Sequence, residues 1–256
     1  MPTTRETALT TTAPARDQLR LLDVQALDTR LAQLAHRRAT LPERAAVTER
    51  QERYASLRDE VVRARTVATD VGREVAKAEQ EVELVRSRAT RNQQRLDSGA
   101  VSAKDATALV AELESLARRQ AVLEDVELEV MERQEQAQAA LAGLETLLAD
   151  VEAEMAEAVT ARDAAIASVD ADVESVTADR ERTASGVDAA LMAVYEQARR
   201  DFRGVGAAPL RARRCEGCRM ELNNVEIGRI RAAPEDAVLR CEECERILVR
   251  TPESGL

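Results

Sequence analysis

Between residues 54 and 96, a set of nearly all apolar residues recurs at alternating spacings of three and four without interruption, over about six heptads. These residues form the seam of a predicted coiled coil. This period predicts an α-helix that buries a narrow apolar stripe against a second helix. A stripe this narrow cannot bury itself, so the segment requires a partner helix. The stripe consists of Tyr54, Leu57, Val61, Ala64, Ala68, Val71, Val75, Ala78, Val82, Val85, Ala89, Asn92 and Leu96.

The stripe ends in the stretch RLDSGAVSAKD, which predicts a turn between two helices. Ser98 and Gly99 provide a helix stop, and Ser102 is suited to cap the next helix. A second apolar stripe then runs from Leu109 to Val176 and predicts a helix that ends near Ala184. Polar residues interrupt this stripe at Gln120, Glu127, Gln134, Arg162 and Asp172.

The two predicted arms are similar in length, at about 80 residues or roughly 120 Å each. Only a short turn joins them, so each arm meets the other at a high local concentration. We therefore predict an antiparallel coiled-coil hairpin within one chain. In the alternative arrangement, each helix pairs in parallel with its copy in another chain. The composition is typical of coiled coils, since 33% of the residues are charged and only 1% are aromatic.

Breaks in the pattern divide the chain into four predicted segments. The N-terminal residues are rich in Thr, Ala and Pro and show no apolar period, which predicts disorder. Pro42 predicts a kink in the first arm, because proline removes a helical hydrogen bond. The predicted segments are a disordered N-terminus (1–15), a helical hairpin (16–185, with a kink near 41–42 and a turn near 97–104), a short helix with a basic linker (186–210) and a cysteine-containing domain (211–256).

All four cysteines lie in the last segment, as two CxxC pairs separated by 22 residues. Two such pairs predict a tetrahedral zinc site, because each short turn brings two thiolates about 2.3 Å from one ion. Four thiolates close the coordination shell, so the predicted zinc is structural rather than catalytic. Two disulfides are one alternative, but a reducing cytoplasm disfavours them. A redox-active CxxC is the other, but it normally opens a helix in a βαβ pattern, which this chain lacks. The predicted ligands of one zinc ion are Cys215, Cys218, Cys241 and Cys244.

The residues around the cysteines are too few to form a hydrophobic core without a metal. Alternation in VLRCEECERILVR predicts short strands, and we expect the residues between the two cysteine pairs to form small hairpins. The predicted fold class is mainly α: a long antiparallel coiled-coil helical hairpin followed by a small C-terminal β zinc ribbon.

Several classes of protein are disfavoured by the sequence. No apolar run approaches the roughly 18 to 20 residues of a membrane span, and the N-terminus lacks the apolar core of a signal peptide, so we expect a cytoplasmic protein without membrane contact. His36 is the sole histidine. No Ser/His/Asp constellation or glycine-rich phosphate loop accompanies it, so we expect neither catalysis nor a small-molecule substrate.

A basic segment precedes the cysteines in a chain whose net charge is -10. Arginine side chains match phosphate oxygens and release counterions on binding, so this segment is a candidate surface for RNA or DNA. Alternatively, the arginines pair with acidic residues of the hairpin or are solvated in a linker. The candidate nucleic-acid-binding residues are Arg199, Arg200, Arg203, Arg211, Arg213 and Arg214.

Several stretches together carry a resemblance to a known family: LLDVQALDTRLAQL with TLPE, RLDSGAVSAKDATALVAELESL, VYEQAR, CEGCRMEL and CEECERILV. With them, the chain resembles the bacterial family of long coiled-coil hairpin proteins that end in a C4-type zinc ribbon. The resemblance implies a separately folded ribbon and a role in binding nucleic acid or partner proteins, with some relatives regarded as regulators or chaperone-like adaptors. That family commonly has glycine after the last cysteine, where this chain has Glu245. A left-handed backbone at Glu245 would cost about 1 kcal/mol.

Two functions follow as expectations. In the first, the protein is a non-enzymatic adaptor whose ribbon and arginines bind the nucleic-acid backbone, with the coiled coil as spacer and partner surface. In the second, it is a protein-interaction scaffold or chaperone-like regulator with no nucleic-acid role, and its protein partner binds the coiled coil.

Overall fold

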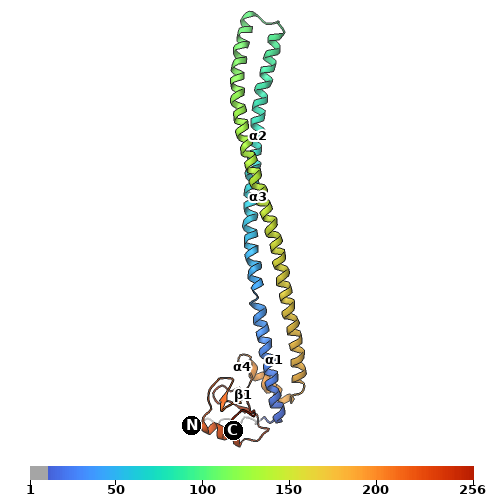
Figure 1. Cartoon of the computed structure of the whole chain (residues 1–256), viewed down its shortest axis with the longest axis vertical. Helices are drawn as coiled ribbons and strands as arrows, with labels where there is room; N and C mark the ends of the chain where they lie inside the picture. Colours follow the sequence, from blue (N-terminus) through green and yellow to red (C-terminus); the bar gives the residue numbers. More distant parts are fainter. Residues whose placement is uncertain (1–10) are drawn as a thin grey trace, which may run out of the picture. The chain divides into compact units, whose positions relative to one another are not determined.

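The computed structural model describes residues 11–256, which form two compact units. One unit comprises residues 43–160, and the other comprises residues 11–42 with 161–256. The predicted fold class, a helical hairpin followed by a small β domain, is confirmed (Figure 1). The helices are α1 (Ala15–Ala39), α2 (Pro42–Asp97), α3 (Ala103–Ala184), α4 (Ala189–Asp201) and α5 (Asn224–Ala232), and the strands are β1 (Ala207–Arg211), β2 (Arg214–Cys215), β3 (Leu239–Arg240) and β4 (Ile247–Val249).

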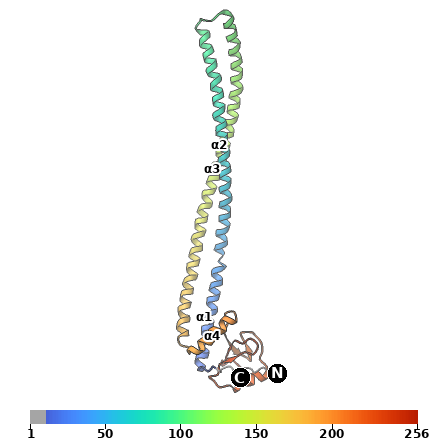
Figure 2. The same ribbon diagram turned by 180° about the vertical axis from the view of Figure 1, so that it is seen from behind.

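The unit of residues 43–160 is a two-helix coiled coil in which α2 and α3 lie side by side (Figures 1 and 2). Ion pairs join the helices along their length and show that they run in opposite directions. As the residue number rises along α2, that of the partner on α3 falls. The pairs are Arg53–Glu154, Arg65–Glu145 and Arg86–Glu124. The antiparallel pairing is thus made within one chain.

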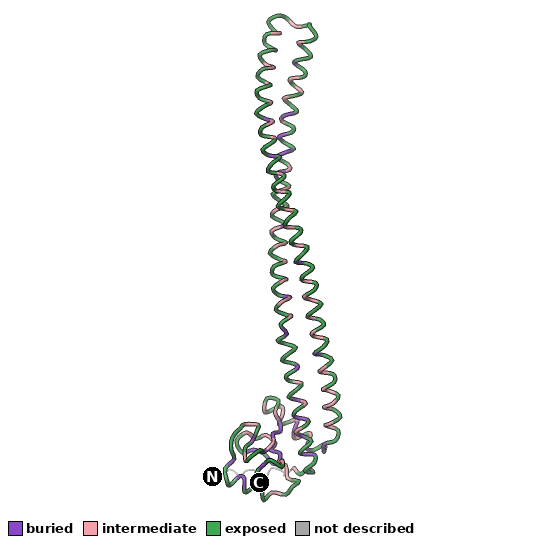
Figure 3. The backbone as a smooth tube through the Cα atoms, in the orientation of Figure 1, coloured by how far each residue is buried: buried purple, intermediate pink, exposed green. Residues whose placement is uncertain are grey.

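The seam predicted for α2 is the face that α3 covers, since each of its positions is buried or half-buried (Figure 3). Val71, Val75 and Val130 form a core cluster between the two helices. Asn92 is also buried, and its side-chain nitrogen has no hydrogen-bond partner among the described residues. In the connection, Gly99 follows the end of α2 with a φ of +65°, and Ser102 caps α3, because its hydroxyl accepts the N–H of Asp105 at 3.2 Å.

In the other unit, α1 packs against the last part of α3. Leu34 of α1, Leu41 just after it and Val169 of α3 form a core cluster, and Arg38 pairs with Asp170 at 2.7 Å on the surface. α1 ends at Ala39, and α2 begins at Pro42, the proline for which the sequence predicts a break.

The C-terminal sheet has the strand order β2-β1-β4-β3. β1 pairs antiparallel with β2 and parallel with β4, and β3 pairs antiparallel with β4. The parallel pair needs a long crossover, which contains β2, both cysteine pairs, α5 and β3. Residues 207–210 were predicted to lie in a basic linker, but they form β1, an inner strand, because both of its faces are buried.

Side chains alternate between the two faces of this sheet, and each face has its own core. On one face, Ala207 and Ile247 pack with residues of α1 and α4, including Leu21, Leu191 and Tyr195. On the other face, Ala208, Leu210 and Leu248 pack with Ile227 and Ile230 of α5 and with Cys215 and Cys241. The ribbon therefore shares a core with the helices. The expectation of a separately folded ribbon, which the family resemblance implied, is wrong.

A buried polar network fixes the sheet to the helices. The Asp28 carboxylate of α1 accepts hydrogen bonds from Arg180 Nε at 2.7 Å and Tyr195 Oη at 2.7 Å. One turn earlier, Gln25 Oε1 accepts the backbone N–H of Gly206 at 2.7 Å. At Gly206 a side chain would collide with the backbone of α4, since an added Cβ would lie 2.8 Å from the Tyr195 carbonyl oxygen. The network thus joins α1, the end of α3, α4 and β1.

The residues that precede α1 also belong to this unit. Thr12 forms an antiparallel bridge with Ala237, just before β3, and Ala13 is buried. The prediction of disorder for residues 1–15 is therefore wrong for residues 11–15, because the last third of that segment finds hydrogen-bond partners in the ribbon. Residues 1–10 lie outside the described part of the chain.

No helix within residues 11–256 combines the length and the apolar character that a membrane crossing requires.

Replacing Asp28 with Ala should destabilise the unit that contains the ribbon by about 3 kcal/mol, because it removes the acceptor of Arg180 Nε and the closer acceptor of Tyr195 Oη at a buried position. Hydrogen exchange of amides in α4 and β1 under mild denaturant measures the change. The matched control is Asp170→Ala, which removes an exposed ion pair and should cost less than about 1 kcal/mol. Equal effects of the two variants would contradict the structural role of the network.

Candidate metal centre

The first cysteine pair lies in a tight turn that continues from β2. The N–H of Cys215 donates to the Met220 carbonyl at 3.0 Å, and the N–H of Arg219 donates to the Cys215 carbonyl at 2.7 Å. The N–H groups of Gly217 and Cys218 point at the Cys215 sulfur and donate to it. We call this turn, residues 215–220, the first knuckle.

The second cysteine pair repeats this geometry between β3 and β4, in residues 241–246, which we call the second knuckle. The N–H of Cys241 donates to the Arg246 carbonyl at 3.0 Å, and the N–H of Glu245 donates to the Cys241 carbonyl at 2.8 Å. The N–H groups of Glu243 and Cys244 donate to the Cys241 sulfur. Backbone donors to sulfur stabilise thiolates, so each knuckle is built to hold an anionic ligand pair.

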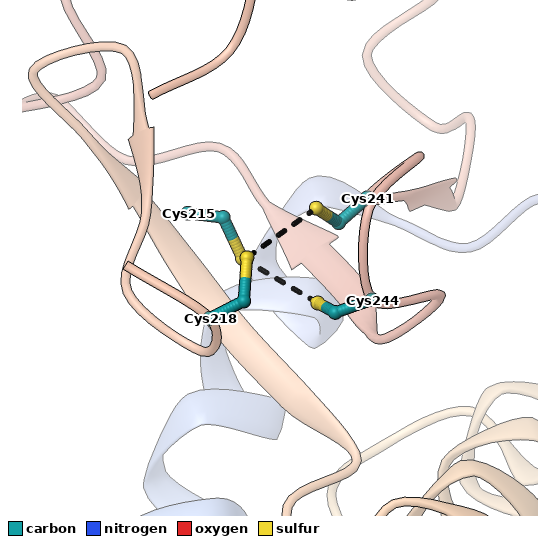
Figure 4. A group of neighbouring side chains, drawn as sticks. All are labelled: Cys215, Cys218, Cys241 and Cys244. Carbon is teal, nitrogen blue, oxygen red and sulfur yellow. Dashed lines mark hydrogen bonds between the residues drawn. The ribbon is translucent and has the colours of Figure 1, made fainter. Parts of the chain in front are cut away.

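The two knuckles bring the four predicted ligands together (Figure 4). All four sulfurs lie within 4.8 Å of one another, and the pairs Cys215–Cys244 and Cys218–Cys241 are each 3.9 Å apart. Tetrahedral zinc with bonds of about 2.3 Å requires sulfurs about 3.8 Å apart. A disulfide requires about 2.05 Å, and all four cysteines are free thiols. The donor set therefore fits one structural zinc ion, as predicted.

The thiols differ in their acid–base properties. Burial raises the pKa of Cys215 above its usual range and that of Cys241 to about 11. Burial also opposes ionisation of Cys244, but hydrogen bonds from Arg246 and the neighbouring thiols lower its pKa overall. Since zinc binds thiolates, the metal must displace protons from Cys215 and Cys241.

The residue after each pair has a left-handed backbone, with φ of +62° at Arg219 and +60° at Glu245. Glu245, which stands where the family in the resemblance commonly has glycine, thus has a left-handed backbone. Neither residue is glycine, so both positions carry the steric cost of a Cβ in this region. The residues between the knuckles differ from the expected small hairpins. They form α5, because Asn223 caps a helix whose Ile227 and Ile230 are buried under the sheet.

The six candidate arginines do not lie on one surface. Arg199 is half-buried in the polar network, where it pairs with Glu196 at 3.0 Å and Asp28 at 3.4 Å. Arg200 and Arg203 lie at or just beyond the end of α4, before β1 begins. The remaining arginines lie at the far end of β1, roughly 13 Å along the strand. These three residues, Arg211, Arg213 and Arg214, belong to the turn between β1 and β2, which we call the arginine turn.

The arginine turn is a two-residue hairpin rather than part of a flexible linker. Ala212 and Arg213 both have positive φ, at +46° and +64°, and the flanking residues Arg211 and Arg214 pair across the strands. The N–H of Ala212 donates to the Glu253 carbonyl at 2.7 Å, and that of Arg213 donates to the Ser254 carbonyl at 2.9 Å. The C-terminal residues therefore hold the turn in place.

Sequence reasoning missed Arg246, which connects the second knuckle to α4. Its Nε donates to the Val205 carbonyl at 3.0 Å, and its guanidinium lies 5.6 Å from the centre of the Phe202 ring. The one available signal was an arginine two residues after the last cysteine, and its partners are about 40 residues away in the sequence. No local pattern identifies such a contact.

Replacing Cys218 with Ser should remove the single zinc ion per chain, because three thiolates hold it far less tightly. The ribbon should then lose hydrogen-exchange protection, and α1 and α4 should loosen because they share its core. The coiled coil of residues 43–160 should retain its protection. Elemental analysis and exchange mass spectrometry measure both effects, with the exposed Glu216→Ser as the control within the same knuckle. A Cys218→Ser protein that keeps a full equivalent of zinc would contradict the assignment.

Replacing Glu245 with Gly should stabilise the zinc-loaded ribbon by about 1 kcal/mol, since glycine adopts a positive φ without the steric cost of a Cβ. Denaturant unfolding followed by zinc release measures the gain. Glu243→Gly is the matched control, because Glu243 lies in the same knuckle at a position where φ is not positive. Stabilisation by both variants would show that the left-handed backbone is not the cause.

Comparison with known proteins agrees with this architecture. Residues 24–203 match the CT398-like coiled coil hairpin domain, and residues 214–248 match the C4-type zinc ribbon domain. An uncharacterised protein of Mycobacterium tuberculosis is 38% identical over 238 residues, which cover 93% of this chain and 97% of that protein. A solved structure from Mycobacterium smegmatis is 36% identical, with a TM-score of 0.82 over 93% of this chain and 100% of that chain.

A more distant solved structure, CT398 from Chlamydia trachomatis, shares the fold. It is 19% identical, with a TM-score of 0.63 over 92% of this chain and 98% of that chain. The hairpin match covers well over half of the residues, and the zinc-ribbon match includes all four cysteines. The chain therefore belongs to the CT398-like family of coiled-coil hairpin proteins with a C4-type zinc ribbon.

Proposed function

We propose that this protein is a non-enzymatic adaptor of the cytoplasm that binds the phosphate backbone of nucleic acid through the arginine turn. A coiled-coil hairpin joined to a zinc ribbon supports an interaction role. The observation that carries the nucleic-acid proposal is the placement of Arg211, Arg213 and Arg214 on a tight turn. That turn leads directly into Cys215, so zinc orders its backbone.

An ordered turn favours phosphate binding because less conformational entropy is lost when its side chains engage a ligand. Arginine pairs with phosphate through two parallel hydrogen bonds, and three arginines can contact successive phosphates of one strand. The strands on either side of the turn are hydrogen-bonded to each other, and its two central N–H groups are also held. The three arginine side chains therefore start from a fixed backbone.

The present partners of these arginines can be exchanged for phosphate. Arg211 pairs with Glu253 at 2.6 Å, but both side chains are more than 60% exposed, and such surface pairs contribute at most about 1 kcal/mol. Arg213 contacts the neutral amide of Asn224. Arg214 is exposed and has no side-chain partner among residues 11–256.

The same surface is poorly equipped to read bases. The chain has only three aromatic residues, and Tyr195 is fully buried in the polar network. Stacking on aromatic rings is the usual way to hold single-stranded bases, and the arginine turn contains none. We therefore propose that the arginine turn binds nucleic acid through charge and nearly independently of nucleotide sequence.

A second function is favoured by the surface of the coiled coil. Leu84 is 70% exposed, and Val62 and Leu128 are each 59% exposed. Large apolar side chains left on a helical surface suit contact with another protein. In this function the hairpin is a docking scaffold, and the ribbon has no nucleic-acid role.

The triple variant Arg211→Gln, Arg213→Gln and Arg214→Gln should bind RNA and DNA more weakly while zinc content and helicity stay unchanged. The slope of log affinity against log salt should become shallower by up to about one unit for each lost phosphate contact. Binding of unrelated RNA and DNA sequences at several salt concentrations, followed by fluorescence anisotropy, measures both quantities.

The matched control replaces three exposed arginines of α2 with Gln, namely Arg58, Arg63 and Arg91, and so removes the same amount of charge. It should leave the affinity and the salt slope nearly unchanged. An unchanged slope in the arginine-turn variant would exclude phosphate binding there. In that case, recovery of one protein partner after nuclease treatment would favour the scaffold function.

A further inference from the structure

The two knuckles are equivalent in their internal hydrogen bonds but differ in what supports them from outside. In each knuckle the residue after the first cysteine donates its backbone N–H to a group outside the knuckle. In the first knuckle this residue is Glu216, and its N–H donates to the Pro209 carbonyl of β1 at 3.1 Å. In the second it is Glu242, and no strand carbonyl accepts its N–H. The acceptor is a side-chain oxygen, Glu226 Oε1, at 3.2 Å.

Glu226 lies in an unusual position for a carboxyl group. Only 3% of the residue is exposed, although it lies on a nine-residue helix at the protein surface. The group faces the knuckle of a zinc centre that has four anionic ligands and therefore a net negative charge. Burial of a carboxyl group is costly unless hydrogen bonds compensate it. The contact with Glu242 provides such a hydrogen bond.

Helix α5 holds this carboxyl group in a fixed place. The Asn223 side chain caps the helix by accepting the N–H of Glu226 itself at 2.8 Å. On the buried face, Ile227 and Ile230 are anchored in the core beneath the sheet. Arg229 links the two acidic residues from the outside, at 3.9 Å from Glu226 and 3.3 Å from Glu242.

We propose that Glu226 is a positioning residue of the zinc centre. Its carboxyl oxygen supports the second knuckle in the same way that the main chain of β1 supports the first knuckle. Its acceptance of the Glu242 N–H fixes the turn that presents Cys241 and Cys244. The retention of zinc then depends on a side chain more than 14 residues away in the sequence from either ligand of that knuckle. This inference concerns the metal centre and does not rest on the proposed nucleic-acid function.

The test measures transfer of zinc from the full chain to an excess of a chromophoric chelator at constant pH. Glu226→Ala should release zinc about tenfold faster or more, in the range found for other residues that orient metal ligands. Glu226→Asp keeps the charge but is one methylene shorter, so it should also release zinc faster. Glu226→Gln keeps an acceptor oxygen at the same distance and should stay within about threefold of the unmodified protein.

Hydrogen exchange of two backbone amides separates positioning from a general loss of structure. In Glu226→Ala and Glu226→Asp, the Glu242 amide should lose protection while the Glu216 amide of the first knuckle keeps it. Glu235→Ala, a change at an exposed glutamate of the same domain, is the control and should alter neither amide. If Glu226→Ala does not fold, Glu226→Asp decides the question.

Three results would overturn the proposal. The first is zinc release at the unmodified rate in both Glu226→Ala and Glu226→Asp. The second is equal loss of protection at Glu216 and Glu242, which would indicate a structural role without preference for the second knuckle. The third is release from Glu226→Gln as fast as from Glu226→Ala, because hydrogen-bond acceptance would then not be the cause.

Discussion

The bonds between four thiolates and one zinc ion are the interaction on which the C-terminal sheet depends. Its strands are only two to five residues long, and the two edge strands have two residues each. Strands of this length do not form a stable sheet from their own hydrogen bonds. The metal joins the end of β2 to the loop between β3 and β4, so that the two edges of the sheet are held by one centre. The apolar cores on both faces can then form against a sheet of fixed shape.

The helices contribute a second set of constraints, and these are polar. Asp28, Gln25 and Tyr195 are buried at the point where α1, α4 and β1 meet. An apolar contact tolerates small rotations, whereas a carboxylate that accepts bonds from both Arg180 and Tyr195 requires one arrangement of three elements. The zinc ion therefore fixes the sheet internally, and the network fixes its attachment to α1 and α4.

Much of this architecture could be predicted from local patterns in the sequence. The heptad spacing from Tyr54 to Leu96 identified the seam of α2, and the two CxxC pairs identified the metal ligands, because both signals repeat at short range. β1 could not be recognised, since Gly, Pro and Arg in GVGAAPLRARR are typical of a linker. Its burial on both faces comes from tertiary contacts with α1, α4 and α5, which no local pattern in the sequence reveals. For the same reason neither the Asp28 network nor the contact of Glu226 with the second knuckle could be inferred.

The pairing of Thr12 with Ala237 has a consequence for the order in which the chain folds. The ribosome makes Thr12 long before Ala237, so residues 11–42 must wait for the ribbon to emerge before the bridge can form. The coiled coil of residues 43–160 closes at a single turn, where its contacts nearest in sequence form first and bring the more distant ones together. The nascent protein should therefore have a complete hairpin while residues 11–42 still lack most of their partners. During that interval the buried face of α1, with Leu21 and Val24, is the apolar surface that a chaperone would meet.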